Sequence, residues 1–470
     1  MGSKQDLNLA QPLTLKCGLT LPNRLVKAAM AEGLGTKGLP TDERLLSAYR
    51  SWAQGGWGMI LTGNVQIDRR YLGSPADVYV DAPSLSDPAT KASTLAAFQK
   101  YAETAKPPPS ASSSPSGGQR AAVIVQINHP GRQSPLGSGS RPFLSKTVAP
   151  SAIQLSLGGT GASSPLAYLL TKLLFGTPRE LTIPEIKDII SRFAQTALFL
   201  AEAGFDGVEI HAAHGYLLSQ FLSPSSNQRT DAYGGTPAKR AQIIIEIIHS
   251  IRETLAKDGR YPHFAVGIKI NSADVQSDGE KGLQECIEQL QLIVDAGVDF
   301  VEVSGGSYDD PRMFVGKDDD STASSSNTKE VLPAASESSQ KREAFFQTYC
   351  AAIRPTLSSS THETPLMLTG GFRTRKGMET ALSIKDCDMV GIGRPAVINP
   401  HLPNNTILNT EVSDKDAIAY AKKVPIPGWF GSIARKILPR VIGAGYETTW
   451  YVERIKDVGF GPSGKDGQKK

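Results

Sequence analysis

The feature that most constrains the fold of this chain is a series of eight short, almost uninterrupted apolar runs. A half-exposed strand alternates apolar and polar residues, whereas a parallel strand covered on both faces is apolar throughout. The runs therefore predict buried parallel strands in an α/β protein. They are Leu25–Ala31, Met59–Ile67, Ala121–His129, Gly207–Ile210, Phe264–Asn271, Phe300–Gly305, Pro365–Gly370 and Met389–Gly393.

Amphipathic helical patterns lie between and after these runs. Alternation of eight strands with helices predicts a (β/α)8 TIM barrel. A doubly wound sheet is the structural alternative, but no Gly-x-Gly-x-x-Gly opens a helix after the first strand. The helical patterns are Asp42–Gln54, Pro88–Thr104, Pro184–Ala203, Ala238–Ala256, Gly282–Asp295, Lys341–Ile353, Arg375–Ser383 and Asp414–Lys422.

A length of 470 residues suits one large domain with insertions or two ordinary domains. We expect a barrel over residues 1–400, with low-complexity surface insertions near 107–118 and 316–340, which are too rich in Ser, Pro, Gly or Asp to bury a core. Residues 401–470 are expected to form a C-terminal extension. Its aromatic side chains predict packing on the barrel or on a partner subunit.

The composition argues against several classes of function. The net charge is only +4, from 50 basic and 46 acidic residues, which gives no reason to expect a nucleic-acid or membrane partner. The four cysteines are far apart, so they indicate neither a disulfide framework nor a metal or iron–sulfur site. The sequence has no apolar run of about 18 residues. The first ten residues have no apolar stretch typical of a secretory leader, so we expect none, and we expect a cytoplasmic location.

The segment Gly207–Gly235 carries the clearest chemical signal. It begins as an apolar strand and then presents His211, His214 and Tyr216 within six residues. Positions i and i+3 of a flat strand point to opposite faces, so the chain must bend after His211 if these side chains are to converge. In parallel α/β proteins such strand ends hold the chemistry. Taken alone, the two histidines would also suit a metal site or a structural role.

The complete sequence of this segment strongly resembles that of the Old Yellow Enzyme family of flavin-dependent NAD(P)H oxidoreductases. His-x-x-His-Gly-Tyr is followed by Asn227 and then by Arg-Thr-Asp-x-Tyr-Gly-Gly. The resemblance covers roughly Leu13 to Pro400. It implies a TIM barrel that binds FMN and takes electrons from NADH or NADPH. It also implies that His211 and His214 bind the substrate oxygen and that Tyr216 donates a proton.

The flavin phosphate needs backbone N–H groups and a positive charge at the last two strands of a barrel. The seventh strand ends in Gly370 and Gly371, and the eighth in Gly393 and Arg394. Glycine lets the backbone approach a ligand closely, and an arginine can bind phosphate with two hydrogen bonds. On the resemblance, these four residues are the expected phosphate site.

The same resemblance assigns the residues that would contact the flavin ring. Gln126 matches the glutamine that pairs with the pyrimidine edge, and Lys269 matches the cationic position near N1. Met30 and Gly63 match ring contacts on the first two strands. Ala31 departs from the family, which usually has Thr or Cys there to hydrogen-bond flavin O4. We expect the absence of this hydrogen bond to lower the flavin reduction potential. His129 matches a family position too, but we interpret it as structural.

The sequence therefore predicts an FMN-dependent ene-reductase, which reduces activated C=C bonds of α,β-unsaturated carbonyl or nitro compounds. The expected partners are small-molecule substrates, and a homo-oligomer is left open. One alternative is an FMN-containing isomerase or biosynthetic enzyme on the same barrel. The other is a barrel that binds phosphate or a metal without redox work. The remaining histidines lie on predicted helices or loops, so no metal ligands are assigned.

Overall fold

The computed structural model describes most of the barrel and part of the C-terminal extension. The insertions predicted near 107–118 and 316–340 lie outside the described residues, as does the first part of the helix predicted at Lys341–Ile353; residues 349–357 are helical. The described ranges are 6–106, 120–143, 145–155, 165–272, 275–304, 349–357, 363–424 and 439–460.

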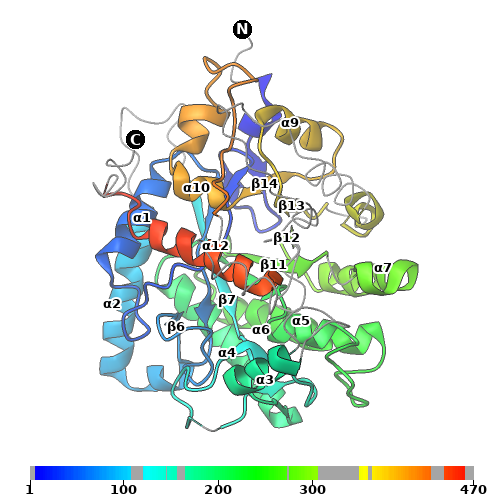
Figure 1. Ribbon diagram of the computed structural model, residues 1–470. Coiled ribbons are helices and arrows are strands. Elements are labelled where there is room, and N and C mark those ends of the chain that lie inside the picture. The colour runs from blue at the N-terminus through cyan, green and yellow to red at the C-terminus, as the bar shows by residue number, and fades with distance from the viewer. Residues whose placement is uncertain are drawn as a thin grey trace.

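Eight parallel strands form a closed ring, which confirms the (β/α)8 barrel (Figure 1). Each strand pairs in parallel with its neighbours, and β14 pairs with β3, so the ring has no free edge and the doubly wound alternative is excluded. The strands are β3 (Leu25–Lys27), β4 (Met59–Leu61), β7 (Ala122–Asn128), β10 (Gly207–Ala212), β11 (Ala265–Asn271), β12 (Phe300–Ser304), β13 (Leu366–Thr369) and β14 (Met389–Ile392).

The strand predicted at Met59–Ile67 is divided in two. β4 ends at Leu61, and the short strand β5 (Val65–Gln66) then pairs with β7 and with β6 (Val78–Tyr79). Between β4 and β5 the N–H of Gly63 donates to the Glu32 carboxylate, 2.7 Å away, instead of to a neighbouring strand. This side-chain contact interrupts the ladder at the mouth of the barrel.

Helices surround the ring and begin at the side chains that favour helix starts. Asp42 caps α1, and Thr182 forms a reciprocal capping box with Glu185 at the start of α4. Gly259 ends α6 in the left-handed conformation, with φ 74°. The helices of the outer layer are α1 (Glu43–Ala53), α2 (Pro88–Ala105), α4 (Ile183–Glu202), α6 (Pro237–Asp258), α7 (Val275–Asp295), α9 (Arg375–Ser383) and α10 (Arg394–Ile398).

The amino-terminal end of the barrel interior is filled by apolar side chains. Phe300, Met367 and Met389 pack there with side chains from the other strands. The hairpin of β1 (Leu13–Thr14) and β2 (Thr20–Leu21) brings Leu15 and Leu21 to the same cluster. At this end Gly267 leaves room for the ring of Phe300, which a Cβ would overlap.

The helix predicted at Asp414–Lys422 is wrong. Residues 411–424 form turns and an isolated bridge between Thr374 and Ile418. The N–H of Ala419 donates to the carbonyl of Arg373 at 2.7 Å, and the N–H of Arg375 donates to Ala417 at 3.0 Å. These long-range bonds use backbone groups that a helix would have paired locally.

The described part of the C-terminal extension lies against the barrel of its own chain. Its helix α12 (Pro439–Ile455), red in Figure 1, contacts α1 and α10. The hydroxyl of Tyr451 donates to the carbonyl of Lys422 at 2.9 Å, and Glu447 pairs with Arg394. No helix among the described residues has the length and apolar character needed to cross a bilayer.

Candidate active site

A sharp backbone turn at the end of β10 brings the two histidines and the tyrosine together. His214 has φ 59° and Gly215 has φ 74°, so the chain reverses directly after the strand. A positive φ is unusual for a residue with a side chain; here Gln133 Nε2 holds the His214 carbonyl at 2.8 Å. The ring centre of His211 lies 5.0 Å from that of His214 and 4.8 Å from that of Tyr216, both edge-on. The bend that the sequence required is present.

Both histidines are neutral at physiological pH. Burial lowers the pKa of His211 well below its usual value, and so does its proximity to the His214 ring and to the Lys269 ammonium. Burial and Lys269 likewise lower the pKa of His214. The N–H of Ala213 donates to His211 Nδ1 at 3.2 Å, so the single proton of that ring is on Nε2. The site therefore offers a neutral N–H donor, which binds an oxygen without first losing a charge.

A polar layer lies above the apolar filling of the barrel interior. Alternate residues of a strand share a face. Gln126 and Glu302 therefore point inward like Ile124 and Phe300, two positions earlier in their strands. Glu209 pairs in register with Gln126, and Lys269 with Glu302, so both lie in the same layer. Lys269 Nζ contacts Glu302 Oε1 at 2.8 Å, and Gln126 Nε2 donates to Glu209 Oε2 at 2.5 Å. Burial and the charge of Glu302 raise the pKa of Glu209.

Two members of this layer, Glu209 and Glu302, were missed by the sequence reasoning. Each is a single carboxylate inside an apolar strand, which was a usable signal because a buried charge needs a partner. Gln126 and Lys269, assigned to the flavin ring, thus lie together and are already paired. The Glu302 carboxylate balances the charge of the Lys269 ammonium.

The ends of β13 and β14 form an open backbone cradle. Gly370 and Gly371 have φ of 125° and 81°, which glycine adopts without strain. A Cβ at Gly371 would meet nothing within 4 Å, and one at Gly393 would meet only the Met30 side chain, at 3.8 Å. The buried Thr369 Oγ1 has no hydrogen-bond partner among the described residues. An accessible backbone at two adjacent strand ends fits the phosphate of FMN.

Arg394, the cation predicted for this cradle, is engaged elsewhere. Its guanidinium forms an ion pair with Glu447 of α12, and its side chain is 31% exposed. The structure therefore brings Arg394 next to Gly393 but points part of its charge at the C-terminal extension. A phosphate in the cradle has to share the guanidinium with Glu447 or displace that carboxylate.

The ends of β3 and β4 carry Met30, Ala31 and Gly63, and the sequence reasoning missed a carboxylate between them. Glu32 accepts hydrogen bonds from the N–H of Gly63 and from the hydroxyl of Tyr49. A Cβ on Gly63 would overlap the Glu32 carboxylate. Ala31 is exposed and its side chain offers no hydrogen-bond donor.

His129 is buried and is not part of the cluster formed by His211, His214 and Tyr216. Its Nδ1 accepts from the N–H of Gly131 at 3.0 Å, and its ring lies 5.0 Å from that of Tyr71. Burial lowers its pKa to about 4. These contacts hold the turn after β7. No group of three or more potential ligand side chains suited to a metal ion occurs in the described part of the chain.

This combination of a closed barrel, neutral histidine donors at one strand end and a glycine cradle at two others defines a flavin-dependent oxidoreductase of the TIM-barrel class. The sequence profile of the NADH:flavin oxidoreductase / NADH oxidase family matches residues 118–410. The chain belongs to this family, and the resemblance to Old Yellow Enzymes is confirmed.

Similar proteins agree with this assignment. The chain is 44% identical over 429 residues to the NADH-dependent flavin oxidoreductase iliE of a Neonectria species, covering 90% of this chain and 51% of that one. It is 40% identical to the protein of the same name from Hypocrea jecorina, covering 90% of this chain and 94% of that one. The solved old yellow enzyme homologue of Zymomonas mobilis has the same fold, with a TM-score of 0.60 at 21% identity over 89% of this chain and 97% of that one.

Proposed function

We propose that this protein binds FMN without a covalent link, takes electrons from NADH, and reduces activated C=C bonds of α,β-unsaturated carbonyl or nitro compounds. The observation that carries the proposal is the convergence of His211, His214 and Tyr216 at the end of β10. When bound, FMN supplies hydride transfer. The names of the relatives, which specify NADH, support NADH as the donor.

The histidines bind and polarise the oxygen of the acceptor. The neutral His211 ring directs its Nε2 proton away from the Ala213 backbone contact at Nδ1. His214 Nε2 lies 3.2 Å from Ser304 Oγ, which fixes that ring against β12. Two positioned donors stabilise negative charge that develops on a carbonyl or nitro oxygen, as in an oxyanion hole. Because both rings are neutral, they increase their hydrogen bonding as that charge grows.

Tyr216 is the proton donor in this scheme. It lies at the start of α5 (Leu217–Leu222), edge-on to the His211 ring and half-buried. A phenol in that place supplies a proton to the α-carbon of an acceptor whose oxygen is held by the histidines. The gain assigned to such a general acid is about 10²–10⁴-fold in rate.

Absorption spectroscopy and product analysis test the proposal. The purified protein should be yellow, release FMN on denaturation, and bleach on anaerobic addition of NADH. Cyclohexenone should then restore the flavin absorbance and yield cyclohexanone. A protein that takes up no FMN would refute cofactor and function together. A flavoprotein that only isomerises the enone, without consuming NADH, would refute the reductase in favour of an isomerase.

A further inference from the structure

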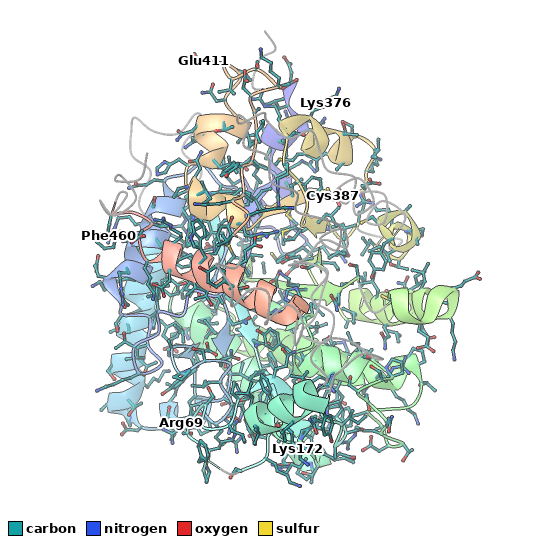
Figure 2. All side chains as sticks on the ribbon, viewed as in Figure 1. Arg69, Lys172, Lys376, Cys387, Glu411 and Phe460 are labelled. Atoms are coloured by element: carbon teal, nitrogen blue, oxygen red, sulfur yellow. The ribbon has the colours of Figure 1, made fainter. Side chains whose placement is uncertain are left out.

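A strongly basic cavity lies outside the cluster formed by His211, His214 and Tyr216. Its volume is about 640 Å³, and it lies between the segment after β5, residues 140–142 and 145–146 after β7, and α4. Figure 2 shows Arg69, one of the lining residues, at the lower edge of the molecule. The cationic side chains on its wall are Arg69, Arg70, Arg141, Lys146, Arg179 and Arg192.

The carboxylates around this cavity do not balance its positive charge. Six cations line it, and four carboxylates pair with them: Asp68, Asp81, Asp188 and Glu185. The excess is two positive charges, confined to one concave surface. A surface of this kind attracts a small dianion, and guanidinium groups match the oxygens of phosphate.

Two of the cations, Arg69 and Lys146, are held less firmly by carboxylates than the others. Arg192 is 10% exposed and contacts Asp188 at 2.7 Å, which makes it part of the wall. By contrast, Arg69 is 54% exposed, and among the described residues its ion pair is with Asp81, at 3.3 Å. Lys146 is exposed, and the structure shows no ion pair between it and any described residue. Arg69 can turn toward a ligand because Asp81 keeps its ion pair with Arg192, at 3.3 Å. The exposed Lys146 can do the same.

The cavity is connected to the active site by one short segment. Arg141, on its wall, donates to Ser134 Oγ at 2.6 Å and to the Ser134 carbonyl at 3.0 Å. The preceding residue, Gln133, holds the carbonyl of His214 at 2.8 Å. Tyr71, also on the wall, packs on the ring of His129 at the base of the same segment. A molecule anchored in the cavity thus lies beside the segment that fixes His214.

We propose that this cavity binds the phosphate groups of a small molecule whose uncharged part reaches the His211–His214 end of the barrel. The inference rests on the proposed function, because that function requires an electron donor with a pyrophosphate and an acceptor near the histidines. The same chemistry would be offered by an acceptor that carries a phosphate. The segment 129–134 links recognition of the anion to the position of His214.

The test uses the FMN-loaded protein and inorganic pyrophosphate as the probe. The variant Arg69→Glu/Lys146→Glu reverses these two charges. Lys376→Glu, a charge reversal exposed on α9 at the opposite end of the molecule in Figure 2, is the control. Calorimetric titration should show pyrophosphate binding to the parent and to the control. Losing two partly exposed charge-assisted contacts should weaken binding about 10-fold in the double variant.

Steady-state kinetics identify the source of the phosphate. If NADH supplies it, the double variant raises KM for NADH about 10-fold and leaves KM unchanged for 1-benzyl-1,4-dihydronicotinamide, which has no phosphate. If the acceptor supplies it, the KM for NADH stays unchanged, but pyrophosphate still binds and competes with the acceptor. Either result supports the site. The inference is overturned if pyrophosphate does not bind, or binds the double variant as tightly as Lys376→Glu. Binding is measured without turnover, so an absence of reductase activity alone would count against only the proposed function.

Discussion

The end of β10 holds its functional groups by backbone geometry, whereas the ends of β13 and β14 depend on an exchangeable ion pair. At β10, the positive φ of His214, the carbonyl contact from Gln133 and the edge-on rings fix the side chains before any ligand arrives. At β14, Arg394 lies beside the open backbone of Gly393 but is bound to Glu447 on another element.

This difference separates two ways to build a site. A preorganised constellation needs no rearrangement when charge develops, which favours catalysis. A cation shared with a carboxylate makes retention of an anion depend on the competition between them. We therefore expect substitutions on the β10 side to change the rate of the reaction, and substitutions on the β14 side to change flavin affinity.

The largest effect is expected for Tyr216→Phe. This change removes only the hydroxyl, so NADH should reduce the flavin at the parent rate. Reoxidation by cyclohexenone should slow by about 10²–10⁴-fold, the usual contribution of a general acid. Stopped-flow absorbance measures both steps, and reoxidation by oxygen is the internal control. Enone reoxidation at the parent rate would show that the proton comes from elsewhere.

Arg394→Ala should act on flavin binding. Loss of a charged donor to the phosphate removes about 1.5–3 kcal/mol, which raises the Kd for FMN about 10- to 100-fold. Fluorescence titration of the flavin-free protein with FMN measures this change. Arg260→Ala, which alters an exposed ion pair with Asp258 at the end of α6, is the control. An unchanged Kd in Arg394→Ala would remove this arginine from the phosphate site.

Glu447→Gln should have the opposite and smaller effect. The amide no longer competes for the guanidinium of Arg394, so FMN should bind up to about fivefold more tightly. The same titration measures it, and the variant should leave the enone half-reaction unchanged. Weaker FMN binding would instead show that Glu447 orients Arg394 for the phosphate and that the ion pair assists binding.

The smallest expected effect is that of pH on substrate binding. Phenolates, whose oxygen the two histidines would bind, measure this effect. Because the pKa values of His211 and His214 are lowered, the affinity for a phenolate, corrected for ionisation of the phenol, should be constant between about pH 6 and pH 8.

The same lowered pKa values predict a pH dependence of stability. Below about pH 6.5 the two histidines become protonated in the unfolded chain but stay neutral in the folded protein, so the free energy of unfolding should fall as pH falls. Urea titrations of the parent and of His214→Asn at several pH values measure how steeply the free energy of unfolding falls with pH, and the fall should be smaller in the variant. A phenolate affinity that changes near pH 6.5 would contradict neutral histidines.

The same contrast explains how far the sequence could be interpreted. The barrel was predictable because buried parallel strands need continuous apolar runs, and the turn after β10 was predictable because His211, His214 and Tyr216 could not otherwise converge. The contact of Arg394 with Glu447 was not predictable, because the two residues are 53 positions apart and no local sequence pattern links them. The Glu32–Gly63 contact, which divides the predicted strand Met59–Ile67, is equally non-local. The helix predicted at Asp414–Lys422 failed because its backbone pairs with residues 373–375.

The apolar filling between the β1–β2 hairpin and the polar layer has a kinetic consequence. It closes the amino-terminal end of the barrel interior, so on the proposed function the electron donor and the electron acceptor must use the same entrance. If both need the same face of a bound flavin, they would exclude each other and bind in turn. The steady-state pattern is then ping-pong, with parallel lines in double-reciprocal plots. A high concentration of the electron acceptor inhibits by binding the enzyme form that the electron donor should bind, and a high concentration of the donor inhibits in the converse way.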